Sequence, residues 1–227
     1  MTQESQTLYW FEPPTGALSF GDGRKPKIGT THRVKGPVRL CGHGLHASAR
    51  VLDAAGYARS PILWGVRLRG EIRYDEDKAA ATEREYVWRF DTTEIMDRFA
   101  RLAALDVIRF WDAPSVVVRF LLTGNPRLRD DANQGAVVGD YISVLDGLRA
   151  AKAADYAAAA AYCATNPRYA DAAYAAQAAN YAALAAYADS YATSGGVNTK
   201  SARAAEIAAS EKYEDWLEQM VREAAGA

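Results

Sequence analysis

The sequence predicts an α+β protein, with a small N-terminal mixed β-sheet domain that carries a short helix, followed by an all-α, alanine-rich helical region. Two observations predict this class. Short apolar runs separated by turn residues fill the first part of the chain, and apolar residues at helical spacing fill the rest. We therefore expect a β-rich domain at residues 1–91 and a helical domain at 92–227, rich in Ala and Tyr from residue 150.

The predicted sheet is built from short strands with aromatic or β-branched residues. Prolines 13 and 14 end the first strand, since proline cannot donate to a ladder. A glycine hook, Gly42–Ser48, leads into a short helix that ends near Gly56, with Ser48 as a candidate N-cap. The expected strands are Leu8–Phe11, Val38–Cys41, Ile62–Leu68 and Tyr86–Phe90.

Helix signals begin at Asp91–Glu94, which has the pattern of a capping box. The predicted helix runs toward Trp111 with an apolar face of Ile95, Phe99, Leu102, Leu105 and Ile108. A shorter helix begins after Pro114 and ends at Gly124, and further helical sequence, interrupted by glycines, reaches Ala161.

Residues 150–192 are about half alanine, the residue with the highest helix propensity. Tyrosines recur there at intervals close to two helical turns, at positions 156, 162, 169, 174, 181, 187 and 191. Asn166-Pro167 and Gly195-Gly196 predict an antiparallel helix pair, followed by a last helix over 199–224 anchored by Ile207, Trp216, Leu217 and Val221. Core or subunit packing is favoured for the tyrosines, because the segment lacks the interleaved basic residues of a base-stacking groove.

The net charge of -1 conceals an uneven distribution. Between Arg24 and Arg73 the chain has eleven Lys or Arg against Asp53 and Glu71. This segment can hold a phosphate-bearing ligand or approach nucleic acid, or it can form solvated strand edges. Two distant cysteines predict no metal site. The absence of a long apolar run and of a secretory signal predicts a soluble, cytoplasmic protein without membrane contact.

The stretch from Gly42 to Asp91 holds the candidate reaction centre. His46 follows Gly44 in the hook, where glycine lets backbone approach a ligand. Glu83 and Glu85 share one face of a strand, and carboxylates stabilise an oxocarbenium-like transition state. The alternatives are a histidine satisfied by backbone in a turn and a solvated strand entry.

These residues resemble the catalytic core of ADP-ribosyltransferases of the poly(ADP-ribose) polymerase type, over residues 8–91. The resemblance rests on the hook 44–48, Tyr57, the strand 62–71 and the Glu-Tyr strand that begins at Glu85. It implies NAD as cofactor, with Tyr57 stacking on nicotinamide and Gly44, Ser48 and Phe11 completing the NAD site. It also implies that His46 contacts a ribose, that Glu85 is the catalytic glutamate assisted by Glu83, and that the target is a host protein or nucleic acid.

Most of the chain, from the hook at Cys41–Ser48 to Trp216-Leu217, is also similar to a group of uncharacterised phage and bacterial proteins with an alanine-rich C-terminal region. This similarity implies a phage or prophage setting in the cytoplasm of a bacterial host. Two hypotheses follow: a divergent ADP-ribosyltransferase, or a non-enzymatic binding or assembly protein whose helices form a homo-oligomer.

Overall fold

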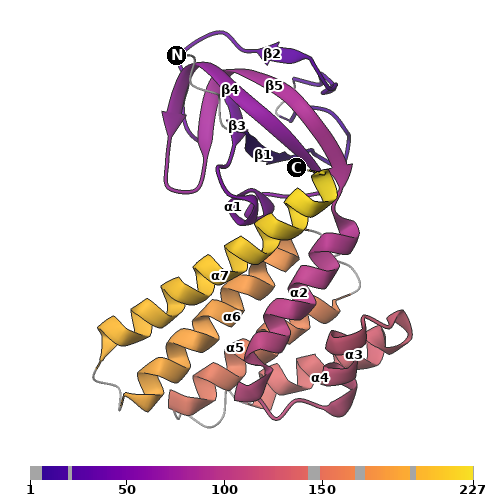
Figure 1. Cartoon of the computed structure of the whole chain (residues 1–227), viewed down its shortest axis with the longest axis vertical. Helices are drawn as coiled ribbons and strands as arrows, with labels where there is room; N and C mark the ends of the chain where they lie inside the picture. Colours follow the sequence, from indigo (N-terminus) through magenta and orange to yellow (C-terminus); the bar gives the residue numbers. More distant parts are fainter. Residues whose placement is uncertain (1–6, 20–21, 143–148, 167–171, 195–197, 227) are drawn as a thin grey trace. The chain divides into compact units, whose positions relative to one another are not determined.

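The computed structural model describes residues 7–19, 22–142, 149–166, 172–194 and 198–226 (Figure 1). The chain divides into two compact units. The first comprises Met1–Thr93 with Asp171–Ala173 and Val221–Ala227, and the second comprises Glu94–Ala170 and Tyr174–Met220. A sheet with a short helix precedes a helical region, so the α+β class is confirmed. No helix in the described ranges is long and apolar enough to cross a membrane.

The sheet of the first unit has the strand order β1-β4-β5-β2, and β3 also pairs with β5. All of these pairs are antiparallel, so the expected mixed sheet is corrected to an antiparallel one for the strands described. The strands are β1 (Leu8–Phe11), β2 (Thr31–Arg33), β3 (Leu45–Ala47), β4 (Ile62–Tyr74) and β5 (Ala79–Asp91).

β4 and β5 form a long hairpin that provides the frame of the first unit (Figure 1). Both strands extend beyond their predicted bounds, because pairing with each other continues past the apolar runs. The register shifts between Gly65 and Val66 and between Arg69 and Ile72. At the first shift a Cβ on Gly65 would lie 2.1 Å from the Trp88 ring, so glycine is what allows the indole to cover this strand.

The glycine hook forms a turn and a strand rather than a turn and a helix start. The Arg39 carbonyl accepts hydrogen bonds from the amides of Gly42 (3.1 Å) and His43 (2.8 Å), so the strand predicted at 38–41 is wrong. Ser48 exchanges backbone hydrogen bonds with Tyr9, at 2.8 and 2.9 Å, and is not the predicted N-cap. The short helix α1 (Val51–Gly56) begins after Arg50, whose side chain makes no capping bond.

The second unit is helical throughout its described elements. Gly124 ends α3 in the left-handed conformation (φ 64°), as its sequence position predicts. α7 closely matches its prediction. The elements are α2 (Thr93–Val107), η1 (Ile108–Phe110), α3 (Ser115–Thr123), η2 (Pro126–Leu128), α4 (Arg129–Ile142), α5 (Arg149–Thr165), α6 (Ala172–Thr193) and α7 (Thr199–Ala225).

The buried face of α2 differs from the predicted one. Of the five residues expected on it, Phe99 alone is buried; the other buried positions are Met96, Ala100, Ala103, Ala104 and Val107. Three of these are alanines, which a pattern of large apolar residues does not detect. Of the anchors expected on α7, Leu217 and Val221 are buried, whereas Ile207 is 47% exposed.

α5 and α6 are antiparallel, as two contacts between them show. The rings of Tyr156 and Tyr181 stack at 6.3 Å, and the Cys163 thiol lies 3.9 Å from the Gln177 amide oxygen. From the first contact to the second, the α5 residue is seven positions later in the sequence and the α6 residue is four positions earlier, so the two helices run in opposite directions. Their buried side chains are almost all alanine, whereas the described tyrosines are only partly buried. Gly147, Pro167, Tyr169 and Gly195-Gly196 lie outside the described residues.

Candidate functional site

The most unusual polar group in the first unit is a buried arginine on β5. Arg84 is 2% exposed, although arginine is rarely fully buried without an acidic partner. It lies among the side chains of Trp10, His32 and Tyr86 and the backbone of His46, and we call these five residues the Arg84 cluster. β1, β2, β3 and β5 all contribute to it, so only the folded sheet assembles it.

Neutral groups surround the Arg84 guanidinium. Its Nη1 donates to the His46 carbonyl oxygen (2.6 Å), and its Nε and Nη2 donate to the Tyr86 hydroxyl (3.2 and 3.0 Å). The guanidinium carbon lies 3.9 Å from the ring centroid of Trp10, a cation–π distance. No carboxylate accepts a hydrogen bond from it among the residues described. Burial lowers the pKa of Arg84, and the Tyr86 hydroxyl opposes that shift.

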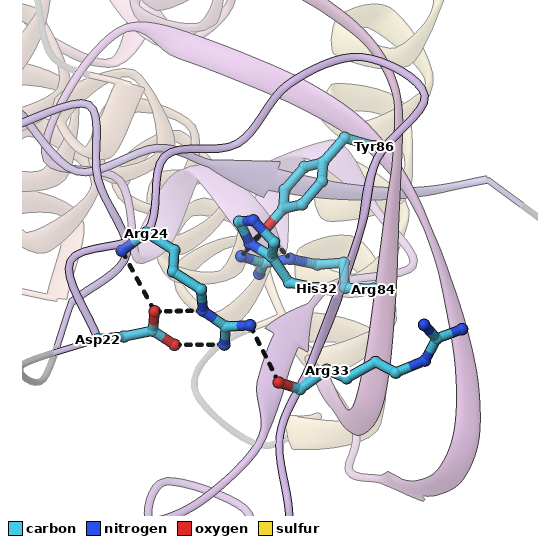
Figure 2. Close-up of polar contacts among 6 residues, drawn as sticks. All are labelled: Asp22, Arg24, His32, Arg33, Arg84 and Tyr86. Carbon is cyan, nitrogen blue, oxygen red and sulfur yellow. Dashed lines mark hydrogen bonds and ion pairs between the residues drawn. The ribbon is translucent and has the colours of Figure 1, made fainter.

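Proton positions follow from this geometry. The Tyr86 hydroxyl oxygen accepts from two nitrogens of Arg84, which uses both of its lone pairs. Its own proton is then donated to Nδ1 of His32, 3.0 Å away (Figure 2). His32 is therefore a neutral acceptor at Nδ1 with its proton on Nε2. Burial, followed by the charges of Arg24 and Arg84, lowers the pKa of His32 and so favours this neutral form.

His46 lies beside the same guanidinium. Its Nε2 is buried and has no hydrogen-bond partner among the residues that the structure describes. Burial and the charge of Arg84 lower the pKa of His46, and a hydrogen bond with the Gly44 backbone opposes them. Because Nε2 is without a partner, the Gly44 bond must involve Nδ1, which carries the proton. The Nε2 lone pair of a neutral imidazole is therefore unused near Arg84, which in a buried site costs stability.

A second arginine fixes the loop before β2. Arg24 forms a two-pronged ion pair with Asp22, at 2.6 Å for both bonds, and donates to the Arg33 carbonyl at 3.0 Å (Figure 2). This bidentate geometry is the strong form of an arginine–carboxylate contact. It ties the loop to β2, and His32 is thereby held against Tyr86.

The two predicted glutamates lie on the other face of β5. Successive side chains of a strand alternate, and β5 carries no extra residue between Ala80 and Tyr86. Glu83 and Glu85 therefore point away from Arg84 and Tyr86. Glu85 forms an ion pair with Arg69 (2.8 Å), and Glu83 forms one with Arg33 (3.1 Å). His46 meets Arg84 through its backbone carbonyl, on the face of β5 opposite to Glu85, so the structure does not bring Glu85 to that contact.

Tyr57 is 55% exposed at the end of α1. Its hydroxyl donates to Asp77 and accepts from Lys78 (3.0 Å), both in the β4–β5 turn, and the Lys78 ammonium lies 5.2 Å from its ring centroid. The carboxylate of Asp77 raises the pKa of Tyr57, and Lys78 opposes this. The Tyr57 ring thus has the ammonium group of Lys78 at a cation–π distance.

The other residues predicted to bind NAD are held in the sheet. Phe11 is buried and pairs with Leu63 across the sheet. Ser48 is also buried, and its backbone exchanges hydrogen bonds with Tyr9. Gly44 has φ 135°, and a Cβ there would lie 3.2 Å from Ala80, so the residue lets the hook approach β5. These placements give the three residues clear structural roles.

In the run from Glu83 to Tyr86, the sequence pattern pointed to the two glutamates, whereas the polar cluster forms around Arg84 and Tyr86. Alternation alone separates the run into a carboxylate face and an Arg-Tyr face. The signal that could have identified the second face is the aromatic Tyr86, the next residue on the same face as Arg84, which is buried. Trp10 and His32 carry no local signal, because their partners are distant in sequence.

One family model matches residues 22–98, that of a domain of unknown function, DUF7666. The match covers about a third of the chain, from the Asp22–Arg24 loop to the first turns of α2. No curated protein and no solved structure gave a match. Among the residues described, no group of three or more His, Cys, Asp or Glu is arranged to hold a metal ion.

Proposed function

We propose that the first unit is a non-enzymatic recognition domain that binds an anionic ligand at the Arg84 cluster. The observation that carries the proposal concerns the described residues: a buried guanidinium has only neutral hydrogen-bond partners, and a buried imidazole nitrogen of the adjoining His46 has none. Perturbed titratable groups of this kind gather at functional sites more often than elsewhere.

The chemistry of the cluster selects the ligand class. An uncompensated buried charge is costly, and an oxyanion beside it removes that cost. Three N–H groups of Arg84 are accounted for, and a guanidinium has five. Nε2 of His46 accepts a hydrogen bond when neutral. The best match is a small ligand with both a phosphate or carboxylate and a hydroxyl or N–H donor.

Charge in the rest of the unit favours the same class of ligand. Residues 1–93 hold 14 Lys and Arg against 11 Asp and Glu, although the whole chain is slightly acidic. Several arginines are neutralised by ion pairs, but four exposed cations on the segment before β3 have no ion pair among the described residues: Lys25, Lys27, Lys35 and Arg39. Such a segment raises the local concentration of anions.

The recognition proposal agrees better with the geometry than ADP-ribosyl transfer does. Transfer would require Glu85 at the reacting ribose, whereas its carboxylate is bound to Arg69 on the opposite face of β5 from Arg84. NAD still belongs to the proposed ligand class, since it has phosphates and ribose hydroxyls. We propose the bacterial cytoplasm as the setting and the alanine-rich helices as the assembly surface, as the phage-protein resemblance suggests.

Binding is tested by calorimetry of the full chain with pyrophosphate, ADP-ribose and NAD. We expect saturable binding that His46→Gln weakens by about tenfold, since a buried hydrogen bond contributes about 1 kcal/mol or more. Arg84→Lys keeps the positive charge but loses the planar, two-pronged donor geometry of the guanidinium, and should weaken binding further. His43→Gln is the control, because His43 is exposed on the same hook and its ring contacts the Lys35 carbonyl, outside the Arg84 cluster. Equal affinities in all four proteins would refute the site.

Catalysis is tested separately by incubating the protein with labelled NAD and a host lysate, beside Glu85→Gln. The recognition proposal predicts no transferred label with either protein. Label that appears with the native chain and disappears with Glu85→Gln would instead establish ADP-ribosyl transfer to a host protein or nucleic acid.

A further inference from the structure

A cavity of about 900 Å³ lies between α5, α6 and α7, within the second unit. Its size is in the range of small-molecule sites. Three tyrosines and three cations dominate its lining: Tyr156, Tyr187, Tyr191, Lys152, Lys200 and Arg203. Figure 1 shows the three helices side by side, so residues far apart in sequence meet here.

The tyrosines present flat aromatic surface to the cavity. Tyr187 and Tyr191 lie one turn apart on α6 and are nearly parallel, with ring centroids 6.1 Å apart and 8° between the planes. Tyr156 stacks on Tyr181 at 6.3 Å. All four rings are partly exposed, and the neighbouring Ala188 is too small to cover them. Rings held at this spacing and not buried can accept a further planar ring.

The cavity is positively charged although the unit around it is acidic. Residues 94–227 carry 13 Lys and Arg against 17 Asp and Glu. In the lining, Glu206 is the acid, and it forms an ion pair with Arg203 (2.6 Å). Lys152 and Lys200 have no ion-pair partner among the residues described. The lining therefore has a net charge of about +2, opposite in sign to the net charge of residues 94–227.

We propose that this cavity binds a small planar aromatic ligand bearing a phosphate, of the nucleotide class. The ring stacks on the tyrosines of α6, and the phosphate lies among Lys152, Lys200 and Arg203. A base-stacking surface requires basic residues, and the fold adds Lys200 and Arg203 of α7 to Lys152, which lies in the tyrosine segment at the start of α5. The site is separate from the Arg84 cluster and does not depend on it.

Titration calorimetry of the full chain with AMP, adenosine, ribose 5-phosphate and inorganic phosphate tests the proposal. AMP should bind at least tenfold more tightly than any of the three fragments, since stacking and charge both contribute. Tyr187→Leu should weaken AMP binding about tenfold and leave binding of inorganic phosphate unchanged. Lys200→Gln, at an exposed position, should weaken both.

The controls are Tyr162→Leu, a partly buried tyrosine of α5 outside the cavity, and Arg119→Gln, an exposed arginine of α3. Both should bind AMP as the native chain does, and His46→Gln should leave unchanged the part of AMP binding that Tyr187→Leu weakens. Equal binding of AMP and inorganic phosphate would show a charge effect only and overturn the proposal. No binding of AMP would overturn it too, as would a single-stranded oligonucleotide that binds more tightly than AMP through Tyr187.

Discussion

Two neutral histidines beside a buried guanidinium make the stability of the first unit depend on pH. The folded protein lowers the pKa of His32 and of His46 below the ordinary value of 6.5, mainly through burial. The unfolded chain therefore binds protons at a higher pH than the folded chain does. Since stability rises with pH wherever the unfolded state binds more protons, the free energy of unfolding should fall as pH drops below about 6.5.

Urea unfolding at about pH 7.5 and about pH 5.5 measures this slope. His46→Gln and His32→Gln should each flatten it, because the variant no longer has an imidazole to protonate. His43→Gln should leave the slope unchanged, since His43 is exposed. A slope identical in all variants would mean that the two imidazoles are not held neutral by the fold.

Gly65 is a residue whose role is set by one neighbour. A Cβ at this position would lie within 2.5 Å of three atoms of the Trp88 ring, which itself packs against Tyr9 at 6.2 Å. We expect Gly65→Ala to cost roughly 1–3 kcal/mol of unfolding free energy, because the indole must move. Gly56→Ala is the matched control, since no atom lies within 4 Å of its added Cβ and α1 should tolerate alanine. Chemical denaturation with tryptophan fluorescence compares them.

At the scale of elements, the long ones were predictable and the short ones were not. α7 carries apolar residues at helical spacing over many residues, and the apolar runs of β4 and β5 predict about half of each strand. β2 and β3 have three residues each and exist because β5 offers them hydrogen bonds. The strand predicted at 38–41 is a turn, Arg39–His43, because apolar-polar alternation over four residues is a weaker local signal than a turn at glycine.

The candidate site shows the same limit. The hook led to His46, which does lie in the Arg84 cluster, because glycines near a histidine are visible locally. The partners of His46 were not predictable, since they depend on which face of β5 the hook meets. Glu85 and Arg84 are neighbours in sequence, and a single step along the strand places their side chains on opposite faces.

α2 and α7 are joined by a polar contact that should stabilise the second unit. Tyr213 is fully buried, and its hydroxyl donates to Asp106 at 2.8 Å, while Lys212 forms an ion pair with the same carboxylate at 2.5 Å. Burial and this bond raise the pKa of Tyr213 well above its ordinary range, so it remains a donor at any physiological pH. Tyr213→Phe should cost roughly 1–3 kcal/mol, as expected for a bond to a charged group.

Thermal unfolding followed by circular dichroism at the helical band measures that loss. Tyr162→Phe provides the comparison, because this tyrosine is partly exposed and its hydroxyl has no hydrogen-bond partner within the described part of the chain. The comparison should differ from the native chain by less than about 0.5 kcal/mol. Equal losses in the two variants would mean that the Asp106 bond contributes nothing.

At the scale of the whole molecule, the β4–β5 hairpin of the first unit and the α5–α6 pair of the second bury side chains of different kinds. The buried side chains of the β4–β5 hairpin include Leu63, Trp64, Val66, Leu68 and Tyr86. Those of α5 and α6 are almost all alanine, a methyl group each. Hydrophobic stabilisation grows with the apolar area removed from water, so each buried residue of these helices contributes less than a buried residue of the sheet.

Native-state hydrogen exchange should therefore separate the units. We expect the amides of α5 and α6 to exchange through openings of lower free energy than those of the β4–β5 hairpin, because local stability follows buried apolar contact. Mass spectrometry of peptides from residues 152–165, 172–193, 62–74 and 79–91 resolves the four segments. High helix propensity favours reclosing of an opened helix but cannot replace buried apolar area. Uniform protection of all four segments would therefore show that α5 and α6 are stabilised from outside their own core. The source would be assembly with other copies or a ligand in the tyrosine-lined cavity.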